Sequence, residues 1–175
     1  ASTLGSALMG NEKYADAEGI FRELVANQRR HPKAGPGTSA FVLLGEDLRR
    51  QGRNDEASAY FREELERQLK APDTDSSAIA STLSYLAAAQ GMMGHGAEAD
   101  SLMQRAYELY ASVSPIQFQR VGRGTMLANR AELAARAGDD TKATPLADSA
   151  RAMWKGTLPP GDARWAALAR VDALI

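Results

Sequence analysis

The chain has 175 residues, 44% of them hydrophobic and 25% charged, a composition typical of a folded domain with one sizeable core. Its 21 basic and 22 acidic residues leave a formal net charge of −1, which argues against a nucleic-acid-binding surface. The chain contains no cysteine, so disulfides, thiolate catalysis and cysteine-ligated metals are excluded.

Segments rich in Ala, Leu, Arg and Glu alternate along the chain with short breaks of Gly, Asn, Asp and Pro. Between residues 56 and 70, apolar residues recur at three- and four-residue steps, which is the spacing of one helical face. No apolar run approaches the roughly 20 residues that cross a membrane as a helix. The breaks predict helices over 1–10, 13–30, 38–51, 54–70, 76–91, 96–111, 116–137, 141–155 and 162–174.

Short turns join these helices in pairs, and longer loops with proline separate the pairs. We therefore predict an all-α fold, a single array of antiparallel helix hairpins that spans residues 1–175. The hairpins are expected at about 1–35, 38–72, 76–112 and 116–156, followed by a capping helix or partial repeat at 162–174.

The hairpins share a register. Leu4-Gly5, Leu44-Gly45 and Leu86-Ala87 each pair a large residue with a small one, and the leading position recurs after 40, 42 and then 44 residues, at Arg130. An alanine follows in the second helix of each hairpin, at Ala17, Ala57, Ala99 and Ala143. We expect Gly45 to lie opposite Ala57 where the two helices of a hairpin cross closely, and Phe61 to fill the space between neighbouring hairpins.

This pattern of a Leu-Gly pair, a later alanine and an aromatic residue four positions on resembles the tetratricopeptide repeat family. The long period resembles the kinesin-light-chain-like repeats of bacterial proteins, as do Ala143-Thr144-Pro145-Leu146 and the link Thr157–Asp162. The resemblance implies a right-handed α–α superhelix. Arg130 departs from it, because leucine is expected there. The first helix is shorter than the register requires, so we expect a piece of a longer protein or a processed chain.

No group of residues in the sequence predicts a catalytic site or a metal-binding site. His31 and His95 lie in predicted breaks without further ligands at metal-binding spacing, and no cofactor motif is present. The Gly-x-Gly pairs at 35–37 and 122–124 follow no strand, so we interpret them as loops or helix breaks. We expect a protein that is not an enzyme; a small-ligand-binding or enzymatic helical domain is a third alternative.

The resemblance implies that the first helix of each hairpin faces a groove that binds an extended peptide or a partner helix. Arginines in this groove can hold carboxylates, while Tyr85 and Asn129 can add apolar contact and hydrogen bonds to a backbone. The Lys/Asn/Arg clamp of some tetratricopeptide proteins is absent, since its places hold Ser2, Ser6, Leu43, Ser81 and Tyr85. The candidate partner-binding residues are Glu46, Arg49, Arg50, Tyr85, Met92, Asn129, Glu132 and Arg136.

Two functions follow from this prediction. The first is a scaffold that binds a protein or peptide, as a regulatory region of a larger bacterial protein such as a Ser/Thr kinase. The second is a structural accessory subunit of a larger complex, including a membrane-bound one. The chain itself predicts no membrane span, and the resemblance favours the periplasm over the cytoplasm.

Overall fold

The structure is a computed structural model that describes residues 2–10, 13–31, 39–72, 74–113, 116–162 and 164–175. Within these residues it contains α-helices and no strand, which confirms the all-α prediction. The predicted helix ends differ most at the last helix, expected over 162–174 and observed over Trp165–Asp172. In chain order the helices are α1 (Ser2–Gly10), α2 (Tyr14–Arg30), α3 (Ala40–Arg50), α4 (Asn54–Lys70), α5 (Ser76–Met92), α6 (Gly96–Val113), α7 (Ile116–Arg136), α8 (Asp140–Trp154) and α9 (Trp165–Asp172).

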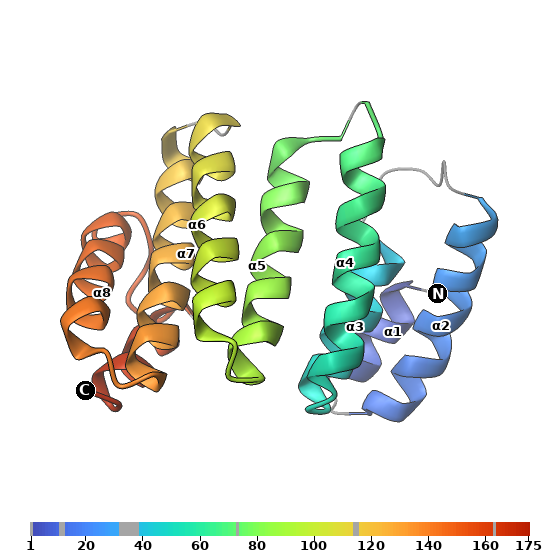
Figure 1. Cartoon of the computed structure of the whole chain (residues 1–175), viewed down its shortest axis with the longest axis horizontal. Coiled ribbons are helices and arrows are strands. Elements are labelled where there is room, and N and C mark those ends of the chain that lie inside the picture. The colour runs from blue at the N-terminus through green and yellow to red at the C-terminus, as the bar shows by residue number, and fades with distance from the viewer. Residues whose placement is uncertain (1, 11–12, 32–38, 73, 114–115, 163) are drawn as a thin grey trace. The chain divides into compact units, whose positions relative to one another are not determined.

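Consecutive helices pack side by side as hairpins, α1 on α2, α3 on α4, α5 on α6 and α7 on α8 (Figure 1). Several of these helices are capped at their N-terminus by a polar side chain. The side chain accepts a hydrogen bond from a backbone N–H of the first turn, which has no partner within the helix. Ser39 caps α3, Asp75 caps α5 with a bond of 2.9 Å from the Ser77 amide, and Asp139 caps α8. The predicted helix hairpins are therefore confirmed.

Three of the hairpin turns have the same backbone conformation. Gly52, Gly94 and Gly138 have φ values of 80°, 84° and 74°, in the left-handed region that glycine adopts without steric cost. The residue after each glycine donates its backbone N–H to the carbonyl five residues earlier: Arg53 to Leu48, His95 to Gln90 and Asp139 to Ala134. This pattern ends a helix and satisfies its last carbonyls. The repeat register thus extends to the backbone of the turns.

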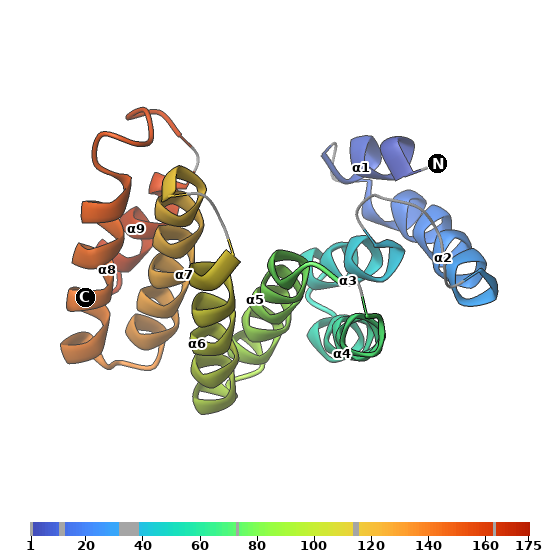
Figure 2. The ribbon, with the colours of Figure 1, turned by 90° about the horizontal axis from the view of Figure 1, so that it is seen from above.

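The chain divides into two compact units, Ala1–Pro72 and Asp73–Ile175. The first unit contains α1 to α4, and Phe21, Phe41, Phe61, Leu44 and Leu48 are fully buried in it. The second contains α5 to α9, with α7 beside α6, α8 and α9 (Figure 2). Each unit therefore has its own core, and the single array over 1–175 stays a prediction.

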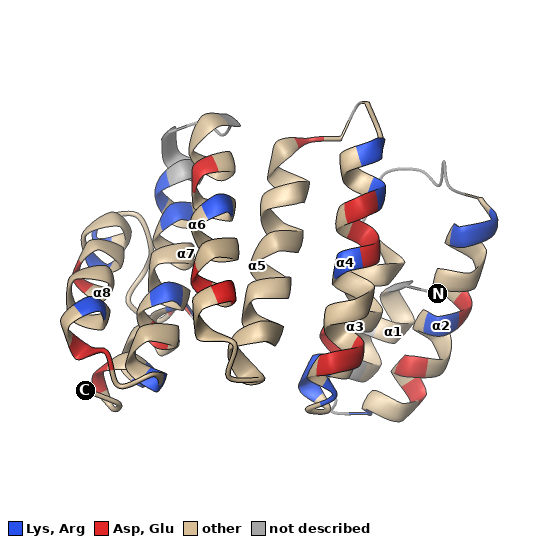
Figure 3. Cartoon of the chain, in the orientation of Figure 1, with Lys and Arg blue, Asp and Glu red and all other residues tan. Residues whose placement is uncertain are grey.

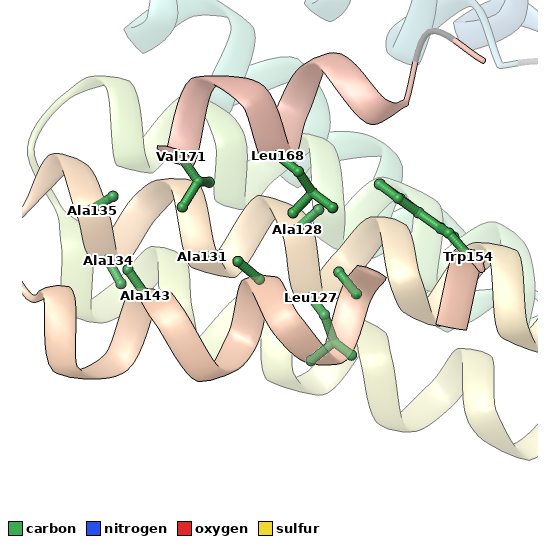
Figure 4. Close-up of a cluster of buried hydrophobic side chains, with 11 residues drawn as sticks. Leu127, Ala128, Ala131, Ala134, Ala135, Ala143, Trp154, Leu168 and Val171 are labelled. Carbon is green, nitrogen blue, oxygen red and sulfur yellow. The ribbon is translucent and has the colours of Figure 1, made fainter. Parts of the chain in front are cut away.

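One cluster in the core of the second unit, between α7, α8 and α9, is built largely from alanines around one large aromatic residue. Trp154 is fully buried at the end of α8, and Leu168 and Val171 of α9 pack into the same cluster (Figure 4). Leu127 and seven alanines complete it, all from α7 and α8; the alanines are Ala128, Ala131, Ala134, Ala135, Ala143, Ala147 and Ala150. Since alanine has almost no side chain, the backbones of α7 and α8 can approach closely. Ala143, the repeat alanine of this hairpin, is one of these alanines.

One packing prediction needs correction. The ring of Phe61 lies directly against Gly45 within the same hairpin, and the ring of Phe21 lies against Gly5 in the same way. We had expected these rings to fill the space between neighbouring hairpins. They instead fill the space that each glycine leaves open inside its own hairpin.

The prediction of a loop or helix break at the glycines of 122–124 is also wrong. They lie inside α7, neither in a loop nor at a helix end, and they lie beneath the rings of Tyr110 and Trp154. The other Gly-x-Gly pair, at 35–37, lies outside the described residues. In the portion of the chain that the structure covers, no helix is both long enough and apolar enough to span a membrane.

Candidate interaction faces of the first helices

The predicted partner-binding residues occupy recurring places on the first helices of the hairpins. The register of 42 and 44 residues makes Arg50, Met92 and Arg136 equivalent on α3, α5 and α7. The same steps relate Tyr85 to Asn129 and Glu46 to Glu132. The candidate residues therefore occupy a few repeat positions, with the same Glu and Arg on α3 and α7 and uncharged residues on α5.

On α3, the acidic candidate holds both basic candidates. The Nε and Nη2 atoms of Arg49 donate to the two carboxylate oxygens of Glu46, each at 2.8 Å. The Nε of Arg50 donates to the same carboxylate at 3.2 Å. Because one glutamate already accepts from both guanidinium groups, their charge is partly neutralised before any partner arrives.

The equivalent ion pair recurs on α7. Arg136 donates to Glu132 at 2.8 Å, and Arg170 of α9 donates to the same carboxylate at 3.1 Å. Burial raises the pKa of Glu132, but the hydrogen bonds from Arg170 and Arg136 outweigh burial and leave that pKa below its ordinary value. Glu132 therefore links α9 to α7 through an ion pair, and it is also one of the candidate partner-binding residues.

The candidates on α5 and the remaining one on α7 are uncharged. Met92 is 55% exposed at the end of α5. Tyr85, earlier on the same helix, is half-buried. Figure 3 shows that α5 carries no charged residue along its length. Asn129 is half-buried on α7, and the described residues offer its side chain no hydrogen-bond partner. This neutral part of the second unit has apolar surface and one available amide.

The structure places the candidates in both units. Glu46, Arg49 and Arg50 meet on α3 in the first unit, whereas Tyr85, Met92, Asn129, Glu132 and Arg136 belong to α5 and α7 in the second. The helices α5 and α7 contact each other, so these five residues lie on neighbouring first helices. Each set is a candidate face by itself.

Comparison with known proteins identifies the repeat. Residues 38–112, the stretch from α3 to α6, match the tetratricopeptide repeat family. This stretch of the chain is similar to tetratricopeptide repeats. Members of this family are non-catalytic scaffolds that mediate protein–protein interactions.

Solved structures share the whole fold. A kinesin light chain of Podosopora anserina with nearly identical TPR-like repeats aligns over 99% of this chain and 84% of its own, at a TM-score of 0.73 and 19% identity. A variant of the same protein gives the same coverage and identity with a TM-score of 0.74. At this identity the likeness establishes the fold alone. A comparison with curated proteins found no match.

The repeat register also identifies two ion-pair clusters that the sequence interpretation missed. Glu18 directly follows Ala17 and accepts from Arg22 and Arg53, at 2.7 Å each. Asp100 directly follows Ala99 and accepts from Arg130 at 2.8 Å and from Lys142 at 2.7 Å. The shared position, an acid just after the repeat alanine, is the signal that could have revealed both. Each cluster ties one hairpin to the next within its unit.

Arg130 is thereby explained. It replaces the leucine expected at the leading repeat position, and its guanidinium also donates to Gln104 of α6. Burial raises the pKa of Asp100, but hydrogen bonds from Arg130 and Lys142 prevail and lower it below the ordinary value. An ion-pair cluster therefore stands where the repeat would place an apolar contact.

Asp47 is a further residue that the sequence did not single out. It is fully buried on α3, next to the candidate Glu46, and burial raises the pKa of its carboxyl above the ordinary value. Gln51 donates to its Oδ2 at 2.8 Å, while its Oδ1 has no hydrogen-bond partner among the described residues. No residue pattern predicts this burial, because alanine occupies the equivalent place in α5.

The histidines lie where the sequence placed them, outside the helices. His31 follows α2 and is exposed, and His95 lies in the turn between α5 and α6. The Nδ1 of His95 is 2.8 Å from the Gln90 side chain, so this ring helps to close the turn. Over the residues that the structure describes, no three His, Asp or Glu side chains come together as a metal site.

Proposed function

We propose that this chain is an interaction scaffold that binds an extended peptide or a protein segment on the first-helix face of its second unit, over α5 and α7. The observation that carries the proposal is the position of Asn129, a half-buried residue on a helix that contacts the uncharged α5. The side-chain amide of asparagine can both donate to and accept from the backbone of a partner.

The chemistry of this face suits an uncharged stretch of polypeptide. Asn129 can donate to a backbone carbonyl and accept from a backbone N–H. Tyr85 and Met92 supply apolar contact, and methionine adapts its shape to different side chains. Main-chain bonds then provide affinity, while the aromatic and thioether groups select the side chains.

The arginine candidates take a secondary role in this proposal. A partner carboxylate at Arg49 or Arg50 competes with Glu46, and one at Arg136 competes with Glu132. Such a carboxylate gains little net energy, because it replaces an ion pair that already exists. Arg136 therefore adjusts the orientation of a partner that Asn129 and Tyr85 recognise in the second unit.

The finer alternatives from the sequence remain proposals. The long repeat period supports a regulatory region of a larger protein, such as a Ser/Thr kinase, by resemblance. An obligate accessory subunit would be expected to present a broad apolar surface. The large apolar residues exposed in the described chain are scattered, at Leu4, Leu69, Met92, Leu174 and Ile175, which favours the peptide-binding scaffold.

A photo-crosslinking residue placed at Met92 tests the scaffold directly. Leu69 is the matched control, since it is an apolar residue exposed to 54% on a second helix, compared with 55% for Met92. We expect the Met92 position to capture one discrete protein from cells that express the chain, and Leu69 to capture none. Equal capture at both positions would contradict the proposal.

A second arm tests the amide. Asn129→Ala and Tyr85→Ala should each weaken binding of the captured protein several-fold, with an unchanged helical circular dichroism spectrum. Replacement of Arg49 and Arg50 by alanine should weaken it less. If the arginine variant alone abolished binding, recognition would instead lie on α3 of the first unit.

A further inference from the structure

Asp47 of α3 is a buried carboxyl group that the proposed partner-binding face does not use. The side chain is fully buried, and its Oδ2 accepts one hydrogen bond, from Gln51 at 2.8 Å. Its Oδ1 is buried without a hydrogen-bond partner among the described residues. The equivalent residue on α5 is Ala89, which is also fully buried. An ionisable group therefore occupies a place that a methyl group fills in the next hairpin.

Gln51 connects Asp47 with a second carboxyl group, that of Glu18 on α2. The Nε2 atom of Gln51 donates to Oδ2 of Asp47 at 2.8 Å and to Oε2 of Glu18 at 3.3 Å. One uncharged amide thus lies between two acidic groups on different helices. Glu18 also pairs with Arg22 and Arg53, at 2.7 Å each. Its charge is compensated by two cations, whereas Asp47 accepts only from the neutral amide in the part of the chain that the structure describes.

The helices that pack against α3 bring both signs of charge near Asp47. Helix α1 has no ionisable side chain. Glu18 of α2 adds a negative charge, and Arg53, just before α4, adds a positive charge that it shares with Glu18 and Glu56 at 2.7 and 2.6 Å. Arg50, on α3 itself, pairs at 3.2 Å with the glutamate directly before Asp47 in the sequence. The arginines near Asp47 are therefore paired with other carboxylates.

The two carboxyl groups that Gln51 connects differ in their affinity for a proton. Burial, aided by the negative charge of Glu18, outweighs the hydrogen bond from Gln51 and raises the pKa of Asp47 above its ordinary value. Burial acts in the same direction on Glu18, but the hydrogen bonds from Arg22 and Arg53 prevail and lower its pKa. As the pH falls, a proton therefore binds to Asp47 before it binds to Glu18, and it removes a buried charge that has no ion-pair partner.

We propose that Asp47 is a pH-dependent switch in the packing of α3 against α2. With a proton on Asp47, the two helices stay closely packed. Loss of the proton leaves a buried negative charge with one unpaired oxygen, and α3 separates from α2 more often. The residues Glu46, Arg49 and Arg50 then lie on a less rigid helix. This switch belongs to the first unit and does not depend on the face over α5 and α7.

The direction of the pH effect follows from the pKa of Asp47 in the folded and unfolded chain. The unfolded value is about 3.9, and the folded value is higher. The stabilisation by the proton is complete below the unfolded value and is lost as the pH rises through the folded value. Glu18, Glu56 and Glu63 have lowered pKa values, so their contributions change below the unfolded glutamate value of about 4.3. The effect of Asp47 is therefore measured above that pH.

Carbon-13 NMR of the Asp47 carboxyl group in the full chain tests the proton directly. We expect this carbon to titrate above the unfolded value of about 3.9, and that of Asp100 in the second unit to titrate below it. The measurement needs no variant, so it cannot be lost to misfolding. Titration of Asp47 at or below the unfolded value would overturn the proposal.

Hydrogen exchange locates the structural effect. After correction for the intrinsic exchange rate, amides of α2 and α3 should lose up to about tenfold in protection per pH unit as the pH rises through the folded pKa of Asp47. All samples carry His31→Gln, because histidine titrates in the same range. Amides of α8, in the second unit, are the internal control and should show no such loss. Equal losses in α3 and α8 would contradict a switch at Asp47.

Asp47→Asn separates charge from shape. Asparagine has nearly the same size and can still accept from Gln51, but it cannot ionise. Protection of α3 should then be independent of pH and should exceed that of the unaltered chain at the upper end of the range. Glu46→Gln, one residue earlier on α3, is the matched control and should keep the pH dependence.

Two results with these variants would also overturn the proposal. A loss of protection in Asp47→Asn that is equal at every pH would show that Asp47 acts through its hydrogen bond to Gln51 alone. Removal of the pH dependence by Glu46→Gln would assign the response to the ion pairs of Glu46 on the surface of α3.

Discussion

Gly45 and Phe61 share a space that no larger pair of side chains could occupy. A methyl group added at Gly45 would overlap the Phe61 ring, and one added at Gly5 would overlap the Phe21 ring. On α7, Gly124 lies against Trp154 in the same manner. A glycine beneath an aromatic ring is thus a recurring way to bring two helices together while filling the core.

Gly45→Ala tests this packing. The added methyl should cost about 1–3 kcal/mol of unfolding free energy, since Phe61 is fully buried and has little room to move. Gly19→Ala is the control, because nothing lies within 4 Å of its added methyl. That change should stabilise the chain by up to about 1 kcal/mol, the helix-propensity difference. Urea denaturation monitored by circular dichroism measures both.

A double variant locates the effect. Combining Gly45→Ala with Phe61→Leu should cost less than the sum of the two single changes, because the smaller side chain makes room for the methyl group. Strict additivity would mean that the Gly45 methyl meets something other than the ring.

At the scale of the helices, ion-pair clusters join neighbouring hairpins within each unit. Glu18 links α2 to Arg53 before α4, and Asp100 links α6 to α7 and α8. Each of these carboxylates accepts from two cations and is at least partly shielded from water. Such clusters fix how one hairpin lies on the next more firmly than single exposed ion pairs can.

Asp100→Asn should therefore destabilise the chain by about 1–2 kcal/mol at pH 7. Hydrogen bonds from Arg130 and Lys142 overcome the effect of burial and hold the pKa of Asp100 below its unfolded value. The stabilisation is therefore present above the unfolded pKa, about 3.9, and disappears as the pH falls through the lower folded pKa. The difference between the two proteins in thermal melts should shrink from pH 5 to pH 2.

The matched control for this change is Glu66→Gln. Glu66 pairs with Lys70 at 3.5 Å, and both side chains are largely exposed, so the loss should be below about 0.5 kcal/mol. A pH-independent gap between Asp100→Asn and the unaltered chain would mean that the aspartate acts through shape rather than charge.

At the scale of the whole chain, two units each enclose a core. Phe21, Phe41 and Phe61 are buried in the first, and Trp154 is buried among alanines in the second. Repeat proteins gain stability from each hairpin and from contacts between neighbours. A unit that keeps its own hairpins and their contacts should therefore keep its fold.

Fragments test this expectation. Residues 73–175 alone should give a helical circular dichroism spectrum and a cooperative thermal transition. Residues 96–175 are the control, because this cut removes α5 and exposes the face of α6 that α5 covers. The shorter fragment should melt at a lower temperature or without cooperativity. Equal melting of the two fragments would show that α5 adds little to the second unit.

The sequence by itself determined the helices, their pairing and the repeat. Helical periodicity and glycine turns act over a few residues, so they can be read locally, and the position of Ala17, Ala57, Ala99 and Ala143 set the register. The candidate residues of the first helices also came from that register, together with the family resemblance.

Only the tertiary structure decided which side chains meet. Phe61 packs on Gly45, Arg49 is held by Glu46, and Arg130 reaches Asp100 across 30 positions of sequence. The division into two units and the exposure of Leu4 also required it. These features depend on how helices cross and on which rotamers fit between them, and neither is encoded in a local pattern.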